Sequence, residues 1–86
     1  MSEYKITFAR SARKELQTLP IDIAERVLEK IETLEFNARP AGSKKLSGSK
    51  DLYRLRVGDY RVVYKIDDND RKVDIAILRH RKDVYR

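Results

Sequence analysis

Residues 52–66 place the strongest constraint on how this chain of 86 residues folds. Two runs in this segment alternate apolar or aromatic residues with polar ones, and only Gly58 and Asp59 separate them. Such alternation predicts half-buried strands, and a two-residue link that contains glycine predicts a tight antiparallel hairpin. A turn at this point also fixes the register, because Val57 then faces Tyr60 and every later pair follows from it.

This register sorts the side chains of the hairpin onto two faces. One face collects residues suited to a core: Tyr53, Leu55, Val57, Tyr60, Val62 and Tyr64. The other face collects cations: Arg54, Arg56, Arg61 and Lys65. Because like charges directly opposite each other destabilise a sheet by about 0.2–1 kcal/mol, folding alone gives no reason to pair Arg56 with Arg61. We interpret the cationic face as a binding surface for phosphate, whose oxygens suit the planar guanidinium fork. The alternative is that these arginines are merely solvated or pair with Asp51, Asp59 or Asp83.

The rest of the chain predicts two helices and two further strands. Alternation over residues 4–8 indicates a first strand, and Val73, Ile75 and Ile77 indicate a last strand over residues 72–78. Apolar residues recur at spacings of three and four over residues 11–19 and 23–34, with Pro20 between them, which predicts two amphipathic helices. Residues 37–48 are expected to form a loop. The predicted order β-α-α-β-β-β is an α+β fold over 1–86 as a single domain, with two N-terminal helices packed on a mostly antiparallel four-stranded sheet.

The net charge of +6 lies entirely in the second half of the chain. Residues 41–86 hold thirteen Lys or Arg against seven Asp, whereas the two signs balance before residue 41. A positive field concentrated on one half of a small protein attracts polyanions, and nucleic acid is the commonest of these in a cell.

Several classes of site are excluded or disfavoured by composition. The chain has no Cys and one His, so it has no disulfide, no thiolate nucleophile and no cysteine-ligated metal. We therefore expect no metal and no cofactor. The chain also has no run of 18 apolar residues and no secretory signal pattern, so we expect a cytoplasmic, soluble protein without a membrane partner.

The C-terminal residues 79–86 add four cations, the only histidine and Tyr85. If the last strand lies beside residues 60–66, this tail emerges at the edge of the cationic face. A site there combines phosphate-binding cations with His80 and with an aromatic ring able to stack on a base. Histidine, as a residue type, titrates near pH 6.5. The alternatives are a surface histidine and a loose terminal tyrosine. We expect further RNA contacts from Lys44, Lys45, His80 and Lys82.

Three segments resemble the RelE/ParE toxin superfamily, in particular its RelE-like branch. They are Lys-Lys-Leu-Ser-Gly at residues 44–48, the hairpin at residues 52–64, and His-Arg-Lys-Asp-Val-Tyr at residues 80–85. The first strand and the Leu19-Pro20 junction also fit, so the resemblance covers nearly the whole chain. It implies the toxin of a type II toxin–antitoxin system, an mRNA interferase that cuts mRNA in the ribosomal decoding site without a metal. The implied partners are the ribosome, mRNA and a RelB-like antitoxin.

The resemblance also implies how the reaction proceeds. A 2′-hydroxyl attacks the adjacent phosphate, and the family's functional positions fall on Arg54, Arg56, Arg61, Arg81 and Tyr85. The first two are often lysine in RelE-like enzymes. Arginine is a poor general base, so we expect Arg54, Arg56 and Arg61 to stabilise the phosphate and its transition state. Arg81 then stabilises the leaving group, Tyr85 stacks or orients the 2′-hydroxyl, and His80 or Tyr85 transfers protons.

Two other functions fit the same sequence. A ParE-like toxin shares the fold but inhibits DNA gyrase by binding it. Gyrase binding gives no reason for a nucleotide-facing cluster at Arg81 and Tyr85. A non-catalytic RNA-binding module binds RNA with a steep salt dependence and leaves it uncut.

Overall fold

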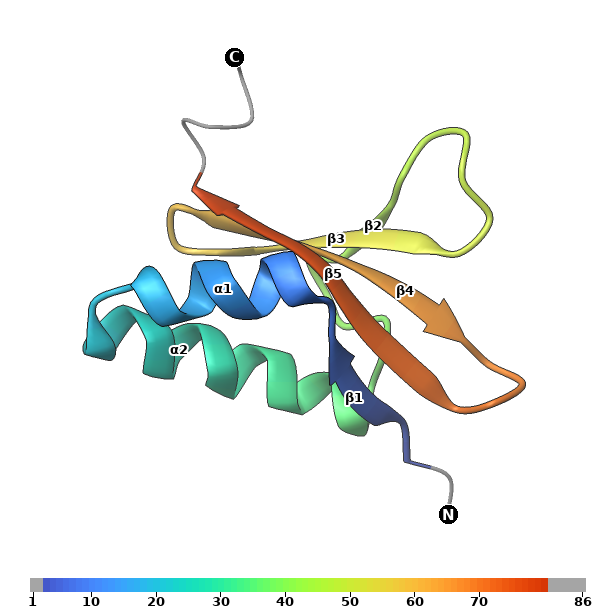
Figure 1. The fold of residues 1–86 in the computed structure, drawn as a ribbon. Helices are drawn as coiled ribbons and strands as arrows, with labels where there is room; N and C mark the ends of the chain where they lie inside the picture. The colour runs from blue at the N-terminus through green and yellow to red at the C-terminus, as the bar shows by residue number, and fades with distance from the viewer. Residues whose placement is uncertain (1–2, 81–86) are drawn as a thin grey trace.

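Two helices cover one face of a five-stranded sheet in the computed structural model, which describes residues 3–80 (Figure 1). The helices are α1 (Arg10–Thr18), α2 (Ile21–Glu32) and the 3-10 helix η1 (Thr33–Glu35). The strands are β1 (Lys5–Phe8), β2 (Lys44–Lys45), β3 (Leu52–Val57), β4 (Tyr60–Asp67) and β5 (Lys72–His80). Their order is β1-β5-β4-β3-β2, with β1 parallel to β5 and the other neighbours antiparallel. The predicted α+β class is confirmed.

Strand β2 is the one element that the sequence did not predict. Its two lysines pair with Arg54 and Tyr53, inside the segment expected to be a loop. A strand of two residues is too short to show an alternating pattern, so nothing in its own sequence distinguishes it from the loop. Pairing with β3 is what makes this segment a strand, so the sheet has five strands instead of the predicted four.

The β3–β4 hairpin has the predicted register. Val57 pairs with Tyr60 and Arg56 with Arg61, and the pairing continues to Leu52 and Lys65. Gly58 has φ of +58°, in the left-handed region that glycine adopts without strain. A positive φ at the first central residue alone is the pattern of a type II′ turn, whose twist matches that of the two strands.

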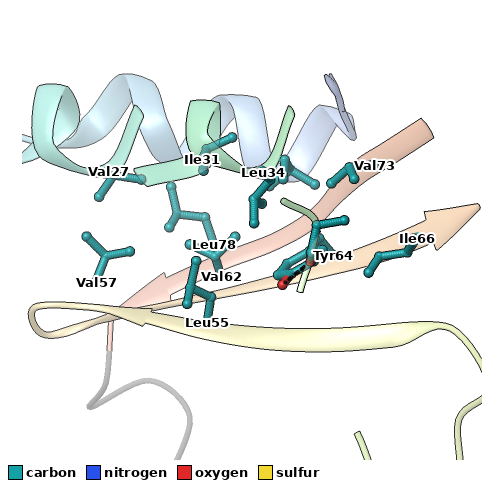
Figure 2. Packing of buried hydrophobic residues seen from close by; sticks show 13 residues of the cluster. Val27, Ile31, Leu34, Leu55, Val57, Val62, Tyr64, Ile66, Val73 and Leu78 are labelled. Atoms are coloured by element: carbon teal, nitrogen blue, oxygen red, sulfur yellow. Dashed lines mark hydrogen bonds between the residues drawn. The ribbon is translucent and has the colours of Figure 1, made fainter. Parts of the chain in front are cut away.

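The core lies between the helices and the sheet (Figure 2). Val27, Ile31 and Leu34, spaced four and three residues apart, are at most 1% exposed and point towards the strands. Tyr64 of β4 is fully buried, and its hydroxyl donates a hydrogen bond to the carbonyl of Ala38 at 3.0 Å. Burial raises the pKa of the Tyr64 phenol. The spacing that predicted α2 is thus the stripe that packs on the sheet, at about 1.5–3 kcal/mol for each buried side chain.

Strand β5 contains a bulge at Ala76. Val63 pairs with Ile77, but the next residue Tyr64 pairs with Ile75, so Ala76 is an extra residue on β5. An extra residue reverses the alternation of side chains for the remainder of a strand.

The bulge changes which residues at the end of β5 face the helices. Strict alternation predicts Ile77 in the core, yet Ile77 is 38% exposed and Leu78 is 3% exposed. Arg79, opposite Arg61, therefore lies on the outer face of the sheet, and His80, opposite Tyr60, lies on the face that the helices cover.

An exposed polar network joins three segments at the other end of β4. Both oxygens of Asp68 accept hydrogen bonds from Arg39, at 2.9 and 3.3 Å, and one also accepts from Tyr4 at 2.6 Å. Arg39 in turn donates to the hydroxyl of Tyr53 at 3.0 Å. The hydrogen bonds from Arg39 and then Tyr4 lower the pKa of Asp68, and the hydrogen bonds to Asp68 and then Tyr53 raise the pKa of Arg39. The network ties Tyr4, just before β1, and Arg39, in the segment after η1, to the β4–β5 turn.

The Asp68 network predicts a loss of stability in acid. A carboxyl whose pKa is lowered by folding stabilises the folded state above its unfolded pKa, ordinarily 3.8, and loses that stabilisation as the pH falls through the folded pKa. We expect Asp68→Asn to lower the Tm at pH 7 and to weaken the fall in Tm below about pH 4. Thermal melts from pH 7 to pH 2.5 measure this, with Asp70→Asn in the same turn as the control. An equal fall in Tm of the two variants between pH 4 and pH 2.5 would contradict the role of Asp68 in acid stability.

Candidate nucleic-acid interface

Three arginines form a row across the outer face of the sheet. Arg56 of β3 lies opposite Arg61 of β4, and Arg61 lies opposite Arg79 of β5. Residues directly opposite each other on neighbouring strands share a face, so the three guanidinium groups project from the same side. Neighbouring strands are about 4.8 Å apart, and this arginine row (Arg56, Arg61 and Arg79) therefore spans about 10 Å across the strands.

A second set of side chains lies next to the arginine row. Lys44 of β2 pairs with Arg54 of β3, and Arg54 pairs with Val63 of β4. Arg54 is two residues from Arg56 on the same strand, so both face outward. Each of the four strands from β2 to β5 therefore contributes at least one cation to this region of the outer face.

The acidic residues of the described chain do not neutralise the arginine row. Within residues 3–80, the ion pairs join Arg39 to Asp68 at 2.9 Å and Lys65 to Asp51 at 3.9 Å, and neither includes an arginine of the row or Arg54. Asp51 and Asp59, considered as partners of these arginines, pair with none of them; Asp83 lies outside the described residues. The row thus carries like charges side by side, a cost that an anionic ligand removes.

The other predicted site residues divide into three groups. Lys44 lies beside Arg54, whereas Lys45 pairs with the inward-facing Tyr53 and so lies on the opposite face of the sheet. His80 also lies on that opposite face, with its ring 5.0 Å from the ring of Tyr60 in an edge-to-face contact. Outside the described residues lie Arg81, Lys82 and Tyr85.

His80 lines a hollow of about 230 Å³ on the helix side. Its walls come from α2 and from the β3–β4 turn, and include Ile23, Arg26, Val57 and Tyr60. The arginine row lies on the other side of the sheet. Both helices lie on the face opposite that row (Figure 1), so the candidate phosphate-binding groups are presented on a sheet face that no helix covers.

Arg79 belongs to the site but was not predicted as part of it. Counting outward from Val73 and Ile75 in strict alternation places Arg79 with the core residues and His80 with the arginines, the reverse of the observed arrangement. Two features of the sequence hint at the bulge: alanine at position 76, and two adjacent large apolar residues, Ile77 and Leu78, which cannot both face the core.

Residues 3–80 contain neither a metal-binding cluster nor a membrane-spanning helix. Among residues 3–80 no three His, Asp or Glu side chains come together in a group able to hold a metal ion. In the same part of the chain, no helix has the length and apolar character needed to cross a membrane.

Comparison with known proteins gives consistent likenesses over nearly the whole chain. A family model described as the ParE toxin of the type II toxin–antitoxin system ParDE matches residues 6–85. Toxin RelE of Mycobacterium tuberculosis is 34% identical over 84 residues, which cover 96% of this chain and 87% of that protein. Toxin RelE3 of Methanocaldococcus jannaschii is 32% identical, with coverage of 94% for both proteins.

Solved structures of toxins have the same fold. A chain in the crystal structure of the archaeal RelE–RelB complex from Pyrococcus horikoshii superposes with a TM-score of 0.83 at 36% identity, covering 92% of this chain and 96% of that chain. The isolated RelE toxin of Escherichia coli superposes with a TM-score of 0.80 at 27% identity, covering 95% and 90% of the two chains.

Proposed function

Because the chain belongs to the RelE/ParE superfamily and is a toxin of a RelBE-type toxin–antitoxin system, we propose that it is an endoribonuclease that cleaves mRNA in the ribosomal decoding site. The arginine row carries this proposal. Arg56 and Arg61 lie opposite each other on an open face without a carboxylate partner among residues 3–80. Such an arrangement opposes folding but suits a substrate with closely spaced phosphates.

The proposed reaction is an internal transfer within the RNA. The 2′-hydroxyl oxygen forms a bond to the neighbouring phosphorus as its proton leaves. The bond from phosphorus to the 5′-oxygen breaks, and that oxygen takes up a proton, which yields a cyclic phosphate and a free 5′-hydroxyl. The reaction therefore needs stabilisation of the charged phosphorane and transfer of two protons.

Each candidate residue has a proposed role in that reaction. Arg54, Arg56 and Arg61 bind the scissile phosphate and stabilise the phosphorane, since a guanidinium group donates hydrogen bonds at any physiological pH. Arg81 stabilises the leaving oxygen, and Tyr85 stacks on a base or orients the 2′-hydroxyl. Proton transfer falls to Tyr85, because His80 lies on the opposite face of the sheet from these arginines. Lys44 and Lys82 contact the RNA, whereas Lys45 and His80 lie on the face that the helices cover.

The proposed partners follow from this chemistry. A site rich in arginine but without a strong base depends on exact placement of the substrate, and the ribosome supplies that placement by holding mRNA in line for attack. The proposed site of action is therefore the cytoplasm. A RelB-like antitoxin is the proposed inhibitor, because RelE chains of similar structure occur in complexes with RelB. An acidic or amphipathic antitoxin segment is complementary to a chain of net charge +6.

A primer-extension assay in a reconstituted translation system tests the proposed function. Purified protein is added to mRNA with and without ribosomes, and Arg61→Ala serves as the control for contaminating nucleases. We expect cuts within decoding-site codons, dependent on ribosomes and lost in the variant. Absence of cuts in both arms would reject the nuclease. Cuts in naked RNA alone would reject the role of the ribosome.

Gyrase inhibition is the second candidate function, because the matching family model is described as a ParE toxin. A supercoiling assay with purified DNA gyrase distinguishes it from the nuclease. Inhibition of supercoiling by a protein that leaves mRNA uncut on ribosomes would favour gyrase, and the reverse result would favour the nuclease. RNA binding with neither effect would indicate a non-catalytic module.

A further inference from the structure

We propose that Arg79 is a phosphate-positioning residue, and that single-stranded RNA crosses the sheet perpendicular to its strands along the arginine row. This inference rests on the proposed function and deepens it, because it adds a residue to the binding surface and gives the direction of the RNA. The observation that carries it is the register, in which Arg79 lies directly opposite Arg61, itself directly opposite Arg56.

The position of Arg79 is built into the fold. The bulge at Ala76 turns Arg79 outward, and the hydroxyl of Ser11 in α1 donates to the Ala76 carbonyl at 3.3 Å. Leu78, which is 3% exposed, packs on the face that the helices cover and so anchors the end of β5. Packing and hydrogen bonding around Arg79 therefore place it on the outer face, and within residues 3–80 its guanidinium forms no ion pair.

Folding gives no reason for a cation at position 79. Arg79 is exposed, faces another arginine, and forms no ion pair with any carboxylate among residues 3–80. A cation opposite Arg61 adds a second like-charge pair to the one already formed with Arg56, at a cost of about 0.2–1 kcal/mol. A ligand with more than one negative charge along the row offsets both costs.

The shape of the charged region sets the direction of the RNA. The arginine row is perpendicular to the strands and spans about 10 Å, longer than a single phosphate group. Lys44 and Arg54 lie in the next row, two residues along β3 from Arg56, and extend the charged region to β2. Along β4, by contrast, the outward side chains after Arg61 are Val63 and then Lys65, which is paired with Asp51. Along β3, Arg54 and Arg56 extend the unpaired positive charge by about 7 Å, whereas across the strands it reaches from β2 to β5, about 14 Å. Positive charge without a partner therefore extends farther across the strands than along them.

Salt-dependent RNA binding tests the role of Arg79. Binding of a short single-stranded RNA, made uncleavable by a 2′-O-methyl group at each position, is measured for wild-type protein, Arg79→Gln, Arg79→Lys and Arg13→Gln at salt concentrations from 0.05 to 0.5 M. Arg13 is an exposed arginine on α1, so its replacement changes the net charge by the same amount on the helix side of the molecule. Thermal melts of all four proteins confirm that each is folded.

We expect Arg79→Gln to lower the slope of log K against log salt by about 0.7, the contribution of one phosphate contact in a single strand. If affinities converge near 1 M salt, this slope corresponds to about fourfold weaker binding at 0.15 M. Arg79→Lys keeps the charge and should retain the wild-type slope, and Arg13→Gln should also leave it unchanged.

The outcomes separate this inference from the proposed function. Equal slopes for Arg79→Gln, Arg13→Gln and wild type, with mRNA still cleaved on ribosomes, would overturn the role of Arg79 and leave the nuclease standing. Equal losses in Arg79→Gln and Arg13→Gln would also overturn it, since net charge alone then explains the effect. Cleavage on ribosomes by a wild type that binds no free RNA would overturn this inference alone. Failure of the wild type both to bind RNA and to cleave mRNA would overturn both proposals.

Discussion

Arg61→Ala is expected to lower ribosome-dependent mRNA cleavage by about 10²–10³-fold while leaving the Tm unchanged or slightly higher. Arg61 is the centre of the arginine row, with Arg56 on one side and Arg79 on the other. Its removal takes away a donor to the developing charge of the phosphorane. It also relieves two like-charge pairs, which offsets the packing lost with the aliphatic stem of the side chain.

Single-turnover cleavage on programmed ribosomes and thermal melts measure the two effects separately. Arg13→Ala provides the matched control, because it removes the same group from an exposed position on α1. We expect near wild-type cleavage from this control. A large fall in the Tm of Arg61→Ala, with cleavage reduced only in proportion to the folded fraction, would show that Arg61 is structural.

Ile31→Ala is expected to lower the free energy of unfolding by about 2–5 kcal/mol. Ile31 is 1% exposed on α2 and packs in the core with Val27 and Leu34, so its truncation removes buried contacts and leaves a cavity. In a domain of this size the corresponding fall in Tm is about 10 °C or more. Denaturant unfolding followed by circular dichroism measures the loss.

The same helix offers a matched control for this substitution. Ile21 is 78% exposed at the first position of α2, so Ile21→Ala makes the same chemical change outside the core. We expect a change in the free energy of unfolding of no more than about 0.5 kcal/mol. Similar losses in the two variants would mean that burial against the sheet is not what stabilises α2.

Local patterns were sufficient to predict most of the fold. The hairpin over β3 and β4 was predicted in its register, because two alternating runs joined by a Gly-Asp turn permit only one pairing that gathers most of the apolar residues on one face. The spacing of Val27, Ile31 and Leu34 predicted the face of α2 and η1 that is buried against the sheet. The pairing of Arg56 with Arg61, the basis of the candidate site, followed directly from the hairpin.

The sequence alone determined that this small basic chain forms a hairpin with a core face and an arginine face. Only the tertiary structure decided which residues of β5 join that arginine face. The bulge at Ala76 exchanges the sides of Arg79 and His80, and it forms because Ile75 and Leu78 both pack under the helices while Ser11 of α1 bonds to the Ala76 carbonyl. These contacts join residues far apart in the chain, so no local period of the sequence encodes them.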